Sequence, residues 1–215
     1  MEPKLRLIAF APRCIRKNTR DFPGLECLRK DNLEKLSVET YQTAANFKVG
    51  LAENKEAPIT LVSSHGGWKD YVKDGVVTRV FHFWSGREQL QCGSEEDALP
   101  AIKSHGVVIS ACNVLDENQS LPPLLRTAVQ GGRAWTAGMD LVPRSHVVWY
   151  AKHLLELERL EQVNSPQAAL EALLKVDAIL EAKRDRYRDQ RLEKQRQKGD
   201  PETKSWRDLW SMPNI

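Results

Sequence analysis

Three short apolar runs constrain the fold of this chain more than any other feature of its sequence. They are Leu5–Ala11, Ile59–Ser64 and Gly106–Ala111. Short apolar runs that stop at turn or polar signals are typical of buried strands. Segments with helical spacing of apolar residues lie between them, so strands and helices alternate along the chain. This order predicts parallel strands joined by right-handed crossovers, and therefore an α/β fold.

The 215 residues suit a single domain, which we expect to span the whole chain, 1–215. Before the third run, the expected elements are a helix from Asp31 to about Asn54, an edge extension at Gly75–Trp84 and a short helix at Glu95–Ser104. After it come a helix from Ser120 to Gly131, a strand at Arg133–Val142, and helices at His146–Gln162 and from Ser165. The last helix continues into a charged segment at about 181–198. A tail with large apolar residues follows it.

The composition argues against several classes of protein. The N-terminus has only a short apolar run without a cleavage site, and no later run approaches the ~18 residues of a membrane span, so we expect a soluble protein. A net charge of +3 is too small to indicate a nucleic-acid partner. Four scattered cysteines without CxxC pairs indicate reduced thiols and a cytoplasmic location. His82, Cys92 and His105 match no zinc spacing, so neither a metal nor another cofactor is expected.

Two residues with catalytic chemistry follow directly on predicted strands. The run before His65 and the run before Cys112 both belong to the expected parallel sheet, whose carboxyl ends form one ligand-binding edge. A cysteine becomes a nucleophile as its thiolate, and a histidine on a neighbouring strand end can support that form. Gly66 allows close backbone approach, so the amides of Gly66 and Cys112 are the candidate oxyanion hole.

The same segments resemble a known family. A strand ending in Ser64-His65-Gly66 and a later strand ending in Ser110-Ala111-Cys112 are similar to the two active-site signatures of the caspase-like cysteine peptidase clan. The resemblance is greatest to CHAT domains, and it extends to Leu124–Trp135 and Asn164–Ala172, with a weaker match from Trp206. It implies a three-layer caspase-like sandwich with a mostly parallel central sheet flanked by helices. It also implies a cysteine endopeptidase with a His65–Cys112 dyad and a thioester intermediate.

Other interpretations remain open. A cysteine at the end of an apolar strand is often only a small buried hydrophobic residue, and His65 alone would more often be structural. A catalytically silent interaction or scaffold module would keep the same fold. A regulated effector that needs an activating protein partner is compatible with the peptidase. The charged helix is most simply a solvated surface, and a contact with a nucleic acid or an acidic partner is the alternative.

Substrate preference is the least constrained property. The resemblance implies protein or peptide substrates, and a pocket for the residue before the cut that is built by loops after several strands. Arg13 and Arg16 follow the first strand and favour an acidic residue there, because a guanidinium pairs well with a carboxylate. Asp140 and Arg144 lie near the end of a later strand and are further candidates, and Asp140 would favour a basic residue instead. The arginines and Asp140 therefore predict conflicting preferences.

Overall fold

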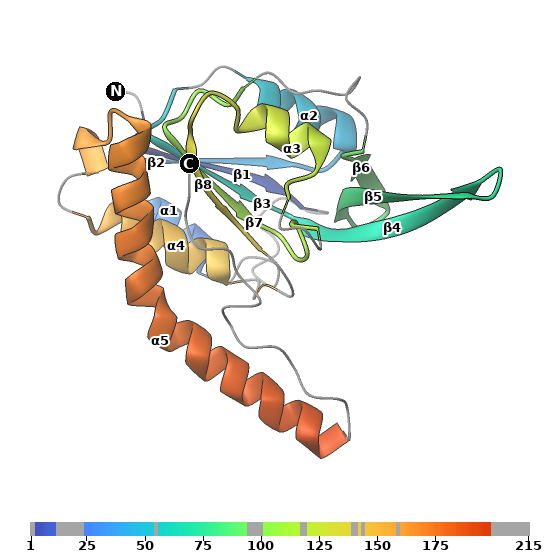
Figure 1. Cartoon of the computed structure of the whole chain (residues 1–215). Coiled ribbons are helices and arrows are strands. Elements are labelled where there is room, and N and C mark those ends of the chain that lie inside the picture. Colours follow the sequence, from blue (N-terminus) through green and yellow to red (C-terminus); the bar gives the residue numbers. More distant parts are fainter. Residues whose placement is uncertain are drawn as a thin grey trace.

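The structure is a computed structural model of the whole chain. It describes residues 3–11, 24–53, 56–93, 101–116, 120–138, 142, 145–157 and 160–198. Figure 1 shows a central sheet between helices, with a long two-stranded arm at one end. The central sheet consists of β1 (Leu5–Phe10), β2 (Leu36–Tyr41), β3 (Ile59–Ser63), β7 (Gly106–Ser110) and β8 (Ala134–Ala137). The strand order is β2-β1-β3-β7-β8, and every pairing is parallel.

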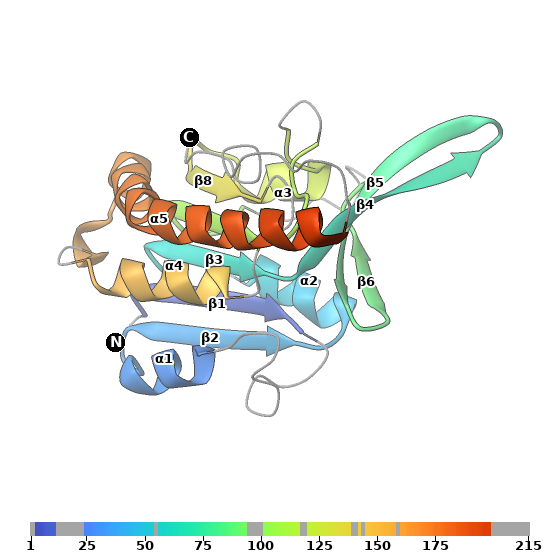
Figure 2. The same ribbon diagram turned by 90° about the horizontal axis from the view of Figure 1, so that it is seen from below.

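Helices cover both faces of this sheet, as Figures 1 and 2 show. The helices on one face are α1 (Leu25–Asp31), α4 (His146–Leu155) and α5 (Pro166–Lys198), and those on the other are α2 (Ala44–Ala52) and α3 (Pro123–Ala128). A short 3₁₀ turn at Leu160–Gln162 precedes α5. Two apolar clusters fill the layers, one around Leu7, Leu61 and Tyr150 and one around Phe10, Phe47 and Ile109. The mixed α/β class predicted from the sequence is confirmed, as are the three apolar runs as strands.

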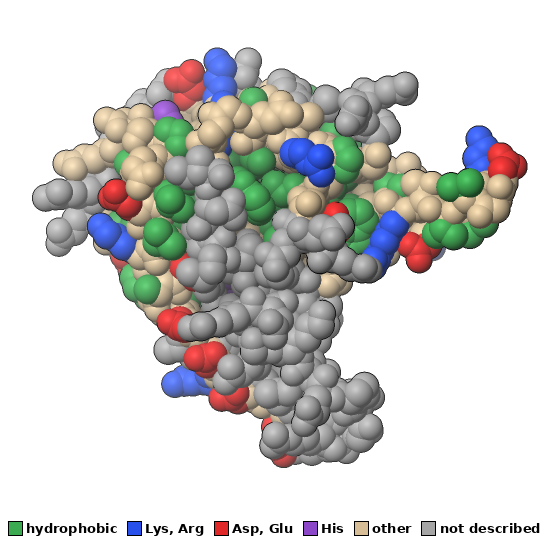
Figure 3. Space-filling model, in the orientation of Figure 1, with side chains coloured by type: hydrophobic (Ala, Val, Ile, Leu, Met, Phe, Trp, Pro, Cys, Tyr) green, Lys and Arg blue, Asp and Glu red, His purple; other side chains and the backbone are tan. Residues whose placement is uncertain are grey.

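A second, antiparallel sheet lies beyond the end of β3. Its strands are β4 (His65–Lys73), β5 (Val76–Ser85) and β6 (Glu88–Gln91), paired in that order. The predicted edge extension at Gly75–Trp84 is thereby confirmed. Asp74 and Gly75 form the turn with φ of 52° and 77°, as an Asp-Gly hairpin turn requires. Val72, Val76 and Val77 are exposed near this turn, and Figure 3 shows hydrophobic side chains along the projecting arm.

The helix predicted from Asp31 to Asn54 is wrong over its first half. Leu36–Tyr41 forms strand β2, and only Ala44–Ala52 is helical, with Thr43 as its N-cap. The Thr43 side chain accepts a hydrogen bond from the Asn46 amide over 3.3 Å. β2 is the outermost strand of the sheet and is mostly half-buried. Its sequence therefore includes polar residues and lacks the apolar run that marks the buried strands. A further helix, α1, precedes it at Leu25–Asp31.

Several other boundaries differ from the predicted ones. Pro122, not Ser120, is the N-cap of α3, which ends at Ala128. β8 is shorter than Arg133–Val142, and α4 ends at Leu155 instead of continuing to Gln162. The helix predicted at Glu95–Ser104 falls mostly outside the described residues, and 101–104 is not helical. The helix expected from Ser165 is confirmed to Lys198, and the tail lies outside the described residues.

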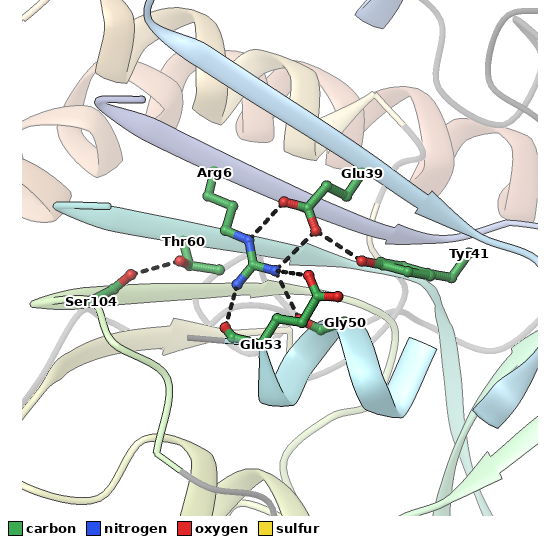
Figure 4. A network of polar contacts seen from close by, with 7 residues as sticks. All are labelled: Arg6, Glu39, Tyr41, Gly50, Glu53, Thr60 and Ser104. Atoms are coloured by element: carbon green, nitrogen blue, oxygen red, sulfur yellow. Dashed lines mark hydrogen bonds and ion pairs between the residues drawn. The ribbon is translucent and has the colours of Figure 1, made fainter. Parts of the chain in front are cut away.

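A buried ion pair joins β1, β2 and α2 (Figure 4). The Arg6 guanidinium donates to both carboxylate oxygens of Glu39, with Nε–Oε1 at 3.0 Å and Nη2–Oε2 at 2.9 Å. It also donates to the backbone oxygens of Gly50 and Glu53 in and after α2. Tyr41 Oη donates to Glu39 Oε2 over 2.8 Å, and burial together with this carboxylate raises the pKa of Tyr41. Arg6 therefore fixes both the edge strand and the helix above it.

Candidate active site at the carboxyl edge of the sheet

His65 and Cys112 follow adjacent parallel strands in the same register. The last pair between β3 and β7 is Ser63 with Ser110, and the Ser64 amide extends the ladder to the Ser110 oxygen over 3.3 Å. His65 and Cys112 each come two residues after that pair. Because neighbouring parallel strands end at one edge of a sheet, the register brings both residues to the same edge. Both are half-buried.

Gly66 lies directly beside the backbone of Cys112. A Cβ atom built on Gly66 would be 2.7 Å from the Cys112 carbonyl oxygen, 2.7 Å from the Phe81 ring and 3.1 Å from the Ala111 Cβ. No side chain fits into this space without movement of the strand end or of Phe81. Gly66 therefore packs against the Cys112 turn as only a residue without a side chain can. The two residues of the candidate oxyanion hole, Gly66 and Cys112, thus lie on neighbouring segments.

The chain turns sharply after Cys112. Asn113 has φ of 50°, in the left-handed region that asparagine tolerates better than most residues. The Val114 amide then donates to the Gly138 carbonyl oxygen over 2.8 Å. Gly138 packs so closely against the Ala111 carbonyl that a Cβ there would overlap it. The cysteine turn is thus held against the end of β8.

The sulfur of Cys112 contacts the backbone of Val142. The Val142 amide donates to Sγ over 3.3 Å, and the Val142 carbonyl oxygen lies 3.9 Å from the same sulfur. An N–H donor at a sulfur stabilises the thiolate, because a hydrogen bond to the charged form favours it. The sequence did not predict this contact. No local pattern in the sequence indicates that Val142 contacts Cys112.

His146 is a further buried polar residue beneath this edge. It is the first residue of α4, and its Nδ1 lies 3.5 Å from Ser110 Oγ. The Ser110 carbonyl oxygen also accepts a hydrogen bond from Ser63 Oγ over 3.4 Å. Ser110 therefore connects α4, β3 and the strand end that carries Cys112. Sequence reasoning treated His146 only as a helix start, although an ionisable residue on a buried helix face is a signal of such a contact.

The remaining predicted residues do not add to the described site. Arg13, Arg16, Asp140 and Arg144 lie outside the described residues, as does Cys14. Within the described ranges, no group of three or more potential metal-ligating side chains is found. His82 is fully buried, with Nε2 2.9 Å from Tyr71 Oη, and burial and then Lys69 lower its pKa. Cys92 is buried, and Cys27 is exposed on α1.

Comparisons of the chain with protein-family models, with curated protein sequences and with solved structures found no match. Among the described helices, none has both the length and the apolar character to cross a bilayer. The long helix α5 is strongly charged over its second half. The geometry around Cys112 is therefore the basis for a functional assignment, together with the resemblance of the two strand-end motifs.

Replacing Gly66 by alanine is expected to lower the free energy of unfolding by about 1–3 kcal/mol, because the new methyl group must displace Phe81 or the Cys112 carbonyl. Gly67→Ala is the matched control. A Cβ at Gly67 would meet the far edge of the half-buried Trp84 ring at 2.8 Å, and that ring can swing away. Urea unfolding measures both. Equal costs for the two variants would contradict the close approach described at Gly66.

Proposed function

We propose that the chain is a cysteine endopeptidase with Cys112 as nucleophile and His65 as general base. The observation that carries the proposal is the register of β3 and β7, which brings the two residues to one edge at the same level. The proposed fold in finer detail is a three-layer caspase-like sandwich. Its support is the parallel sheet with helices on both faces, and the small antiparallel sheet inserted between the histidine strand and the cysteine strand.

The proposed reaction has two steps. In the first, Cys112 Sγ attacks the peptide carbonyl carbon while His65 takes the thiol proton, and the amide N–H groups of Gly66 and Cys112 stabilise the oxyanion. The C–N bond breaks as the leaving amine takes the proton from His65. In the second step, a water molecule gives a proton to His65 and attacks the thioester carbon. The C–S bond then breaks, the sulfur regains a proton, and the carboxylic acid product leaves.

A second candidate is a catalytically silent module that binds other proteins. The observation that favours it is the β4–β5 arm, which projects from the body with three exposed valines near its tip (Figures 1 and 3). Exposed apolar side chains on a projecting hairpin are typical of contact surfaces. The two candidates differ in one property. A peptidase needs a thiolate at Cys112, whereas a binding module does not.

Alkylation of the cysteines tests whether Cys112 is activated. Cys27 is exposed while Cys112 is half-buried, so exposure alone would make Cys27 react faster. An ordinary thiol is only about 3% ionised at pH 7, so Cys112 should react with iodoacetamide about tenfold faster than Cys27. Mass spectrometry of timed reactions on the full chain measures each rate. His65→Gln should slow Cys112 and leave Cys27 unchanged. Faster labelling of Cys27 would mean that exposure alone decides, and the dyad would be wrong.

A further inference from the structure

The amino edge of the central sheet carries a row of basic residues. β1, β3, β7 and β8 are adjacent and in register, with Leu5, Ile59, Gly106 and Ala134 at the same level. The residue immediately before each of these positions therefore belongs to one row across the edge. This row reads Lys4, Pro58, His105 and Arg133. At ~4.8 Å between strands, it extends over about 14 Å.

A cavity of about 510 Å³ opens along this row. All four residues of the row line it, together with Glu56, Lys103 and Ser104. This volume lies in the range of small-molecule sites, which is about 300–1,000 Å³. The cavity lies at the edge opposite to Cys112, because parallel strands begin at one edge and end at the other. It is therefore separate from the proposed active site.

The positive charge of this cavity is partly fixed in place. Arg133 Nε donates to the Ile102 carbonyl oxygen over 2.6 Å, and Nη1 donates to the Gln130 carbonyl oxygen. These contacts use two of the five guanidinium donors and hold the planar group at the cavity wall. Lys103 Nζ lies 3.6 Å from Glu56, and both side chains are about half exposed. Such a solvated ion pair is weak, so an anion in the cavity can replace Glu56 as the partner of Lys103.

We propose that this cavity binds a small soluble molecule with two or more linked phosphoryl groups. Three cationic side chains, Lys4, Lys103 and Arg133, line the cavity with one carboxylate, Glu56, so its described lining is mainly basic. The row is longer than one phosphoryl group, and its cations come from separate strand starts. Arg133 supplies paired donors, while the lysines supply point charges. A linked polyphosphate matches both the charge and the length.

Isothermal titration of the full chain with tripolyphosphate tests the proposal at constant ionic strength. One saturable site is expected, and Arg133→Gln or Lys103→Gln should each weaken binding about tenfold, the loss expected for one charge-assisted contact. The Lys103 side chain is about half exposed, so Lys103→Gln should fold normally and can test the proposal even if Arg133→Gln unfolds. Arg79→Gln, on the β4–β5 arm, is the control with unchanged affinity. The measurement needs no turnover, so it stands or falls independently of the peptidase.

Three results would overturn the proposal. One is the absence of saturable binding. A second is equal affinity in the wild type and in both cavity variants, which would indicate diffuse attraction to a basic protein. The third is citrate binding as tightly as tripolyphosphate, which would show that the cavity has no preference for phosphoryl groups.

Discussion

Cys112→Ala is expected to reduce peptide hydrolysis by about 1,000-fold or more, because without the nucleophile only binding and the oxyanion hole remain. The variant should still fold, since the half-buried sulfur fills little core volume. Release of a fluorophore from a peptide library measures the activity, and thermal unfolding verifies the fold. The peptide preference would also decide between acidic and basic residues before the cut.

The controls for this result are a second thiol and the second member of the dyad. Cys27→Ala removes an exposed thiol from α1 and should leave the activity unchanged. His65→Gln should lose nearly as much activity as Cys112→Ala, since nucleophile and base act as a unit and their effects do not add. A folded Cys112→Ala variant that retains wild-type hydrolysis would exclude Cys112 as the nucleophile.

The interior of the sheet was predictable from the sequence, and its border was not. β1, β3 and β7 are buried on both faces, so each is an apolar run that periodicity detects. β2 pairs only with β1 and is half-buried along most of its length. Val38 and Thr40 are β-branched residues at the two-residue spacing of a strand. Leu33, Leu36 and Tyr41 nearby fit helical spacing, and this led to the prediction of a helix. The prediction of a helix at this position failed because β2 is an edge strand, with a neighbouring strand on one side only.

The candidate site was predictable in position but not in contacts. The strand ends before His65 and Cys112 were visible as the points where apolar runs stop, and parallel pairing brings such ends to one edge. The contact between Val142 and the Cys112 sulfur depends on the path of a connection, which no local pattern determines. The row at the amino edge was only partly visible in the sequence. Lys4, Pro58 and His105 directly precede predicted strands, but Arg133 was assigned to one, and only the register shows that the four residues align.

Arg6→Met is expected to lower the free energy of unfolding by about 3–5 kcal/mol, the cost of leaving one member of a buried ion pair without its partner. Side-chain exposure is 1% for Arg6 and 13% for Glu39, so water screens this pair little. The guanidinium also satisfies backbone oxygens of Gly50 and Glu53, which would lose a donor. Urea unfolding followed by circular dichroism measures the change.

The matched control for Arg6→Met is Arg79→Met. Arg79 pairs with Asp70 at 3.8 Å on the arm, where the side chains are 51% and 63% exposed, and removing such a pair should cost at most about 1 kcal/mol. A second comparison is the double variant Arg6→Met with Glu39→Leu. It removes both charges, so it should regain much of the stability that the single variant loses. If Arg6→Met costs no more than Arg79→Met, the Arg6–Glu39 pair does not hold β1, β2 and α2 together.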